Sequence, residues 1–163
     1  MIRKITAQDF DFIYELYMHP QINPYLLYEL MSPEEFKEIF NDLVQKEIVY
    51  IFYDSDIAAG MFKLMPLTHR NSHIAYLGGL AIHPSFAGKG LGSIMMKEIV
   101  GYAKQKSFLR VELSTAIVNE KAIRLYEKAG FTKEGILRKY THLKKENIFL
   151  DEVLMAWIDK SIQ

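Results

Sequence analysis

The spacing of apolar residues in the first part of the chain predicts a short strand followed by two helices. Residues 2–6 form the strand, and Thr6 can then cap a helix in which large apolar residues recur at helical spacing until Pro20. The letters SPEE at 32–35 have the form of a capping box with proline at the first helical position, so a second helix begins there. Its apolar stripe, which we interpret as a core contact, consists of Phe36, Ile39, Phe40, Leu43 and Val44.

The next part of the chain changes to the pattern of extended strands. Residues 48–53 and 57–65 are rich in β-branched and aromatic residues, and the letters DSD between them are typical of a tight hairpin. A polar turn at 68–72 then leads into a further strand that ends at Ile82. The sheet is therefore predicted to begin as an antiparallel meander and to continue as a β–α–β unit.

Three glycines follow this strand and precede an amphipathic run. In Leu77–Gly92, LGGLAIHPSFAGKGLG, a short apolar run gives way to glycines at 88, 90 and 92. The first N–H groups of a helix lack intrahelical partners, glycine allows a ligand to approach the backbone, and the helix dipole adds positive potential. The pattern predicts a site for a phosphate or pyrophosphate group. The helix after it is expected from about Leu91 to Lys104, with Leu91, Ile94, Met95, Ile99 and Tyr102 facing inward.

Three kinds of anion-binding loop compete for these glycines. A P-loop is excluded, because Lys89 sits between two glycines and no GxxxxGK pattern followed by Ser or Thr exists. A dinucleotide fingerprint would start at Gly88 and need a small residue at 93, where Ser93 stands, and an acid about 20 residues further, where Glu112 lies. That fingerprint usually opens its domain, whereas here about 75 residues precede it. The third kind is an acyl-CoA loop.

The last part of the chain continues the alternation of strand and helix. Residues 110–114 are predicted to form a strand parallel to the one that ends at Ile82, and Asn119 is predicted to cap the following helix. Gly130 stands just past the end of that helix, in a position that favours a left-handed residue. Residues 131–137 and 148–157 are predicted to be the last two strands.

Length and charge narrow the class of protein. The chain has 163 residues, half of them hydrophobic, which suits one domain over 1–163 with a sizeable core. Twenty basic residues balance twenty acidic ones, so no global field draws the protein to nucleic acid or to an anionic membrane. We therefore expect small partners.

The residue types that are missing exclude several chemistries. Without cysteine, the chain has no thiol nucleophile, disulfide or Cys-zinc site, so any acyl transfer must be direct. His69 and His73 flank a turn, where their spacing does not put two ligands on one face, and no metal is expected. The N-terminus lacks an apolar signal region, and no apolar run approaches the roughly 18 residues of a membrane span. We expect a cytoplasmic protein.

Two blocks of the sequence together resemble a known family. The first comprises AIHP at 81–84 and AGKGLG at 87–92, and the second comprises Asn119, Ala122 and the letters LYEKAGF at 125–131. The blocks follow each other in the right order about 30 residues apart, the span of one β–α–β unit. They resemble the GCN5-related N-acetyltransferase (GNAT) family, and the match covers about half of the chain. One departure is Ala87, because the family's loop usually begins with Gln or Arg.

The resemblance implies a fold and a cosubstrate. The implied fold is an α/β GNAT fold with a mixed, mostly antiparallel sheet of six to seven strands, about four helices, and two splayed parallel strands at the centre. Acetyl-CoA is the implied cosubstrate, with pantetheine between the splayed strands and the pyrophosphate on the glycine loop. The residues implied to contact it are Leu80, Ala81, Ile82, Ala87, Gly88, Lys89, Gly90, Leu91, Gly92, Ser93, Asn119, Ala122, Leu125 and Tyr126.

Tyr126 is the side chain to which the resemblance gives a catalytic role. In the family's LYEK pattern a tyrosine hydroxyl lies near the thioester sulfur, where it can protonate the leaving thiolate. By spacing alone Tyr126 would be a core residue, and Asn119 would be only a helix cap.

The general base is not identified by any motif. Glu29, Glu112 and His83 are candidate ends of a water chain, and each also suits a surface or strand-edge role.

The predicted function is direct transfer of the acetyl group of acetyl-CoA to a primary amine of a small molecule or of a peptide or protein N-terminus. A non-catalytic acyl-CoA-binding module and a nucleotide-binding domain are the alternatives. Neutral charge, many aromatic residues and an apolar last strand favour a homodimer.

Overall fold

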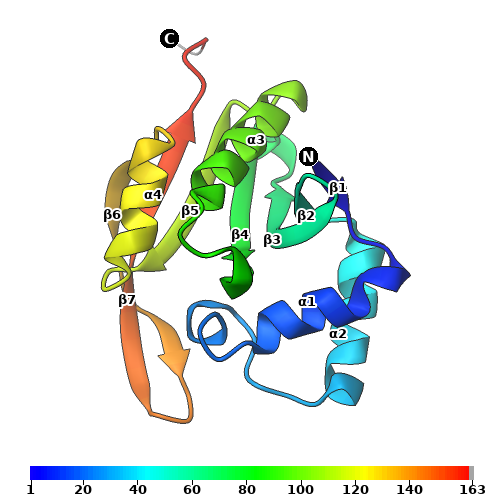
Figure 1. Ribbon diagram of the computed structural model, residues 1–163. Helices are drawn as coiled ribbons and strands as arrows, with labels where there is room; N and C mark the ends of the chain where they lie inside the picture. Colours follow the sequence, from blue (N-terminus) through cyan, green and yellow to red (C-terminus); the bar gives the residue numbers. More distant parts are fainter. Residues whose placement is uncertain (162–163) are drawn as a thin grey trace. The chain divides into compact units, whose positions relative to one another are not determined.

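The computed structural model describes residues 1–161, which fall into two compact units (Figure 1). The first unit comprises residues 1–65 and 77–91, and the described part of the second comprises residues 66–76 and 92–161. The strands form one seven-stranded sheet in the order β1-β2-β3-β4-β5-β7-β6. The predicted α/β fold with a mixed sheet is confirmed, and a single domain over residues 1–163 stays a prediction.

Two helices and the first strands make up most of the first unit. Its elements are β1 (Ile2–Lys4), α1 (Phe10–Met18), α2 (Pro33–Lys46), β2 (Val49–Asp54) and β3 (Ile57–Pro66), followed by the larger part of β4 (Ile74–Ile82). β2 pairs antiparallel with β3, as the hairpin pattern predicted, and also pairs antiparallel with β1. Ser55 has a left-handed φ of 55° in the connecting turn.

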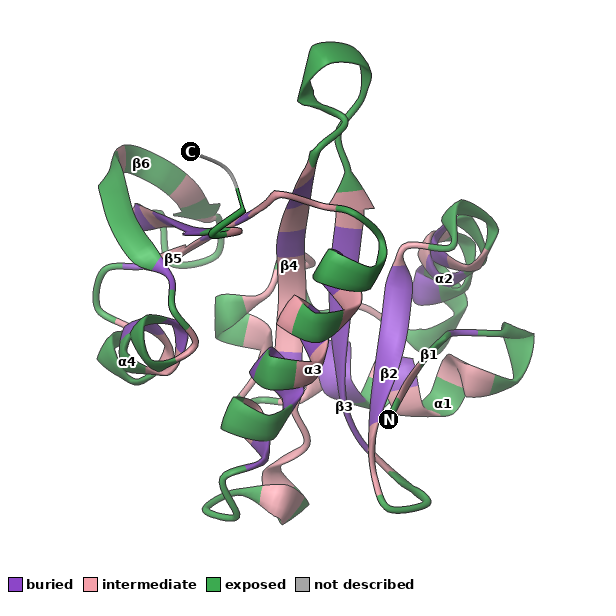
Figure 2. Cartoon of the chain, turned by 90° about the horizontal axis from the view of Figure 1, so that it is seen from above, coloured by how far each residue is buried: buried purple, intermediate pink, exposed green. Residues whose placement is uncertain are grey.

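The core of the first unit lies between the two helices and the strands. Residues from α1, α2, β2 and β3 form one buried cluster, and Figure 2 shows the buried positions along β2 and β3. The predicted stripe of α2 contributes Phe36, Phe40 and Leu43 to this core, while Ile39 and Val44 pack against it. The capping box is confirmed, because the Ser32 amide donates to Glu35 and the Glu35 amide donates to Ser32.

The second unit contains the remaining helices and strands. Its elements are α3 (Leu91–Gln105), β5 (Arg110–Ala116), α4 (Glu120–Lys128), β6 (Thr132–Leu143) and β7 (Ile148–Ile158). β7 lies between β5 and β6 and pairs antiparallel with both. The predicted parallel neighbours are confirmed, since Ile74–Tyr76 of β4 pair with Arg110–Glu112 of β5.

Two expectations about these elements were wrong in detail. Ile94 was predicted to face inward but is 49% exposed, because the buried face of α3 is centred instead on Met95, Met96 and Ile99. β6 continues well beyond residue 137, to Leu143. Its register against β7 shifts between Leu137 and Thr141, and pairing resumes from Thr141 to Leu143, beyond the end of the predicted strand.

No helix in the described part of the chain is both long and apolar enough to cross a bilayer.

Candidate active site

The second half of β4 carries the first group of predicted site residues. Ala81 is buried and Leu80 and Ile82 are partly buried. Gly79, directly before them, has a left-handed φ of 54°, so the strand changes direction there. On the β3 side the main chains approach closely, because a Cβ at Gly60 would lie 2.5 Å from the Ala81 carbonyl oxygen. Leu80 to Ile82 are thus fixed on one side by β3.

The glycine loop follows β4 after a short 3-10 turn at Pro84–Phe86. Gly88 and Gly90 have φ angles of 78° and 73°, a conformation that L residues rarely adopt. A Cβ at either position would meet no atom within 4 Å, so their backbone faces open space. Lys89 between them is exposed, with its ammonium 5.1 Å from the centre of the Phe86 ring. Open space beside a backbone of this shape is what an approaching phosphate needs.

Gly92 has a different reason for being glycine. It is the second residue of α3, and a Cβ there would lie 3.3 Å from a methyl group of Leu125 on α4. Its lack of a side chain lets α3 and α4 approach each other within the second unit.

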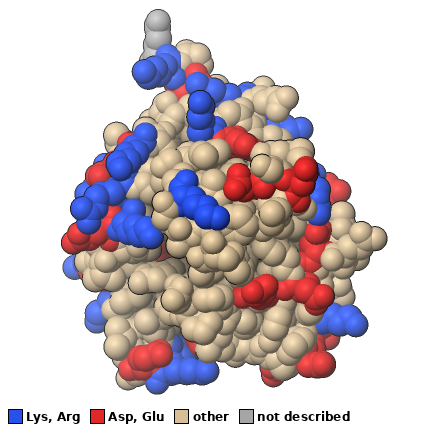
Figure 3. Space-filling view, in the orientation of Figure 1, with Lys and Arg blue, Asp and Glu red and all other residues tan. Residues whose placement is uncertain are grey.

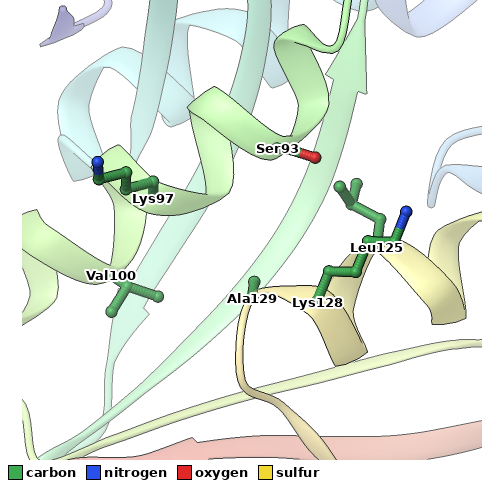
Figure 4. Close-up of a pocket in the computed structure, with 6 residues that line it drawn as sticks. All are labelled: Ser93, Lys97, Val100, Leu125, Lys128 and Ala129. Atoms are coloured by element: carbon green, nitrogen blue, oxygen red, sulfur yellow. The ribbon is translucent and has the colours of Figure 1, made fainter.

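A cavity of about 320 Å³ lies beside this contact, between α3 and α4 (Figure 4). Ser93 and Leu125 were predicted site residues, and the structure brings them together here. The cavity has apolar walls and two exposed lysines, which suits an anionic ligand that also has an apolar or aromatic part. Its lining residues are Ser93, Lys97, Val100, Leu125, Lys128 and Ala129.

Four of these lining residues were not predicted as site residues from the sequence, although helical spacing could have indicated them. Lys97 and Val100 follow Ser93 on one face of α3, and Lys128 and Ala129 follow Leu125 on α4. Their spacing places each set on the same side of its helix.

The start of α4 confirms the predicted cap. The side-chain oxygen of Asn119 accepts a hydrogen bond of 3.3 Å from the amide of Ala122. Asn119 thereby satisfies one of the free N–H groups of the first turn.

Tyr126 is buried on the inner face of α4, with its ring 6.2 Å from that of Phe131. Its hydroxyl makes no hydrogen bond to any residue that the structure describes. Burial raises the pKa of the Tyr126 phenol far above its ordinary value, and the nearby Tyr76 adds to this effect. The phenol is therefore protonated at neutral pH, as both a proton donor and a core tyrosine would be.

A polar cluster within the second unit was not anticipated from the sequence. The Tyr76 and Ser114 hydroxyl oxygens lie 3.0 Å apart, and Ser114 donates a short hydrogen bond to Glu152. Thr141 donates to the other carboxylate oxygen of Glu152 at 2.6 Å. These residues come from β4, β5, β6 and β7, so only the register of the strands brings them together. The signal available was the pair of acids, Asp151 and Glu152, in the otherwise apolar sequence of β7.

The three predicted base candidates have other partners or lie exposed. Glu112 accepts from Arg110 at 2.9 Å. His83 has one ring nitrogen 2.9 Å from Glu15 and the other 2.7 Å from Ser85. Glu29 lies exposed in the loop before α2. Among them, only His83 is positioned in a hydrogen-bonded chain of the kind that can relay a proton.

Charges of both signs occur on the face of the molecule shown in Figure 3. No group of three or more His, Cys, Asp or Glu side chains arranged to hold a metal ion occurs in residues 1–161.

Comparison with known proteins gives one family. The sequence model described as the acetyltransferase (GNAT) family matches residues 10–131. Acetyltransferase PseH of Campylobacter jejuni is 29% identical over 79% of this chain and 80% of its own length. The L-amino acid N-acetyltransferase AaaT of Escherichia coli is 24% identical over 96% of each chain.

Comparison with solved structures gives the same fold. The spermidine N-acetyltransferase of Vibrio cholerae, in complex with CoA and spermine, superposes with a TM-score of 0.84 at 21% identity. The match covers 98% of this chain and 95% of that one.

Proposed function

Because this chain belongs to the acetyltransferase (GNAT) family and is an acetyl-CoA-dependent N-acetyltransferase, we propose that it transfers acetyl directly to a primary amine of a small molecule or peptide N-terminus. The family match sets aside the nucleotide-binding alternative. The named relatives act on different amines, since one is an L-amino acid acetyltransferase and another a spermidine acetyltransferase. The amine must therefore be inferred from this chain's own residues.

The glycine loop carries the proposal. Gly88 and Gly90 hold left-handed angles beside open space, immediately before α3, so their backbone can approach a pyrophosphate closely. Lys89 adds positive charge in the same loop. Within the second unit, the cavity between α3 and α4 has Lys97 and Lys128 at its walls, which also suits an anionic ligand. Ala87 contributes no polar side chain, so the loop is proposed to bind through backbone amides.

The acceptor is an ammonium at neutral pH and first loses one proton; the substitution then moves two more, one off the nitrogen and one onto the sulfur. The acetyl thioester supplies an activated carbonyl carbon. The amine nitrogen forms a bond to this carbon, the carbon–sulfur bond breaks, and the amine loses a proton while the sulfur gains one. Backbone groups of Leu80 and Ile82 are proposed to hold pantetheine and to polarise the carbonyl oxygen. Tyr126 is proposed to protonate the sulfur.

The Tyr76–Ser114–Glu152 chain is our candidate for accepting the amine's proton. An alkylammonium must lose a proton before it attacks, and Glu152 is the carboxylate at the end of this hydrogen-bonded chain. As a carboxylate it has lone pairs beyond those used by Ser114 and Thr141.

Replacement of Glu152 by glutamine is expected to lower kcat/KM for the amine about tenfold at neutral pH, below the usual loss for a general base because solvent water can substitute. The deficit should shrink as pH rises, because the free amine then forms in solution without a base. Initial rates from pH 6 to 10 measure this, with Thr141→Val as the matched control that removes only one hydrogen bond to Glu152. A constant deficit at all pH values would assign Glu152 a purely structural role.

The overall function is tested by incubating the protein with acetyl-CoA and a panel of amines. Free CoA thiol should appear together with an equal amount of N-acetyl product. The panel should contain amino acids, peptides with free N-termini, polyamines and simple alkylamines. Binding of acetyl-CoA without thiol release for any amine would contradict the transfer that we propose.

Homodimer formation and a cytoplasmic location also belong to the proposal. β6 is an edge strand of the sheet and exposes Ile136 (56%) and Tyr140 (57%), an apolar edge of the kind that a second copy can cover. We expect sedimentation equilibrium to give twice the monomer mass. Arg substitution of Ile136 should then produce monomers, whereas a wild-type monomer at high concentration would refute the dimer.

A further inference from the structure

The hydroxyl of Tyr17, on α1, is buried without a hydrogen-bond partner among residues 1–161. Tyr17 as a whole is fully excluded from solvent. Burying a hydroxyl without a partner is unfavourable, and nearly all buried polar groups in folded proteins have one. A partner that is not part of this chain would account for it.

The side chain of Lys63, on β3, lies beside Gly79 of β4, as does the Tyr17 hydroxyl. Lys63 is 6% exposed and is the sole charged side chain in the buried class among the described residues. A Cβ at Gly79 would lie 3.1 Å from the Tyr17 hydroxyl and 3.2 Å from the Lys63 Cε. The Lys63 ammonium is 5.2 Å from the centre of the Tyr28 ring, which in turn lies 5.0 Å from that of Tyr17. We call Tyr17, Tyr28 and Lys63 the Lys63 cluster.

No carboxylate of the described residues neutralises this lysine. Lys63 forms no ion pair in residues 1–161. The acid whose charge acts on Tyr28 is Asp42, and it lies 2.7 Å from Lys46, with which it is paired. Burial lowers the pKa of Lys63, as expected for a cation that lacks a nearby negative charge. The cluster thus offers an ammonium and a hydroxyl, with no carboxylate of the described residues paired to either.

We propose that the Lys63 cluster binds the carboxylate of the acetyl acceptor, so that the acceptor is an amine with a carboxylate a few bonds away, such as an α-amino acid. This inference rests on the proposed transfer of acetyl to an amine. One carboxylate oxygen can accept from the Lys63 ammonium and the other from the Tyr17 hydroxyl.

The position of the cluster along β4 supports this assignment. Gly79 directly precedes Leu80, whose backbone is proposed to hold the pantetheine and its thioester. A carboxylate beside Gly79 therefore brings an amine a few bonds away to the same stretch of strand. A polyamine would instead place a cation against Lys63, which is unfavourable.

The test compares amines that differ only in the carboxylate. A panel of L-α-amino acids and their carboxamides, with spermidine added, is assayed for kcat/KM by thiol release. The wild type should prefer the best acid over its carboxamide by at least about tenfold, as expected for a hydrogen-bonded charge pair. Lys63→Met should lower kcat/KM for that acid about 20-fold and leave the carboxamide within about threefold. Tyr17→Phe should act in the same direction, by about fivefold.

Lys37→Met is the matched control, because Lys37 is an exposed lysine on α2. It should leave both acceptors unchanged. The proposal is overturned if the wild type uses carboxamides or spermidine as well as acids, or if Lys63→Met lowers both classes equally. If Lys63→Met does not fold, Tyr17→Phe, which removes a single oxygen, supplies the same comparison.

A binding measurement separates this inference from the proposed function. If no amine is acetylated, the proposed function fails, but the carboxylate site is still tested by titrating N-acetyl amino acids into the protein in a calorimeter. The wild type should bind them at least about tenfold more tightly than Lys63→Met does, whereas their carboxamides should bind both proteins equally. Equal affinities of the two proteins for the N-acetyl amino acids would overturn the inference.

Discussion

Replacing Tyr126 by phenylalanine is expected to lower kcat about 100-fold, the lower range for loss of a general acid, while the affinity for acetyl-CoA stays close to wild type. The phenyl ring keeps the contact with Phe131, whereas the hydroxyl that would protonate the departing sulfur is lost. Because burial raises the pKa of this phenol, it remains protonated well above neutral pH. Wild-type activity should therefore show no loss that is due to ionisation of Tyr126 near the ordinary tyrosine pKa of about 10.

Tyr25→Phe provides the control for this experiment, because Tyr25 is 61% exposed and lies outside the proposed proton-accepting chain. It removes the same oxygen from the surface and should leave kcat unchanged. A value of kcat for Tyr126→Phe within about threefold of wild type would contradict the role of Tyr126 as a proton donor and would assign it to core packing alone. The hydroxyl makes no hydrogen bond within residues 1–161, so its removal should not destabilise the fold, and thermal unfolding of the variant checks this.

The features that could be predicted are those set by neighbouring residues. The capping box at Ser32, the cap at Asn119 and the left-handed Gly130 each depend on a few consecutive residues, and all three were confirmed. The parallel pairing of β4 with β5 also followed from the order of the elements, because a β–α–β connection leaves little freedom.

The features that were missed depend on contacts between distant segments. Glu152 is joined to Tyr76, Ser114 and Thr141 only through the register of four strands, which no local pattern contains. Lys63 in the letters MFKLM looks like the polar position of an alternating strand. Its burial beside Tyr17 and Tyr28 is decided by α1 and the loop before α2, so the sequence of β3 alone could not reveal it.

Substitution of Gly90 by valine is expected to raise the Kd for acetyl-CoA about 50-fold, which corresponds to a little over 2 kcal/mol. Gly90 has a φ of 73°, and a β-branched residue is strained in that conformation. A Cβ there meets no protein atom within 4 Å, so the added side chain occupies the open space proposed for the pyrophosphate. Backbone strain and crowding of the ligand therefore act in the same direction.

Gly135→Val is the matched control, because Gly135 lies on β6, has no left-handed φ, and likewise has no atom within 4 Å of an added Cβ. It should bind acetyl-CoA with wild-type affinity. Gly90→Ala should give an intermediate Kd, since it adds the strain of a left-handed φ but fills less of the open space. Isothermal titration of acetyl-CoA measures all three variants, and circular dichroism confirms that each is folded. A folded Gly90→Val protein that binds acetyl-CoA with wild-type affinity would contradict the prediction. It would show that neither the altered backbone nor the added side chain at position 90 affects the bound pyrophosphate, so the loop does not bind it.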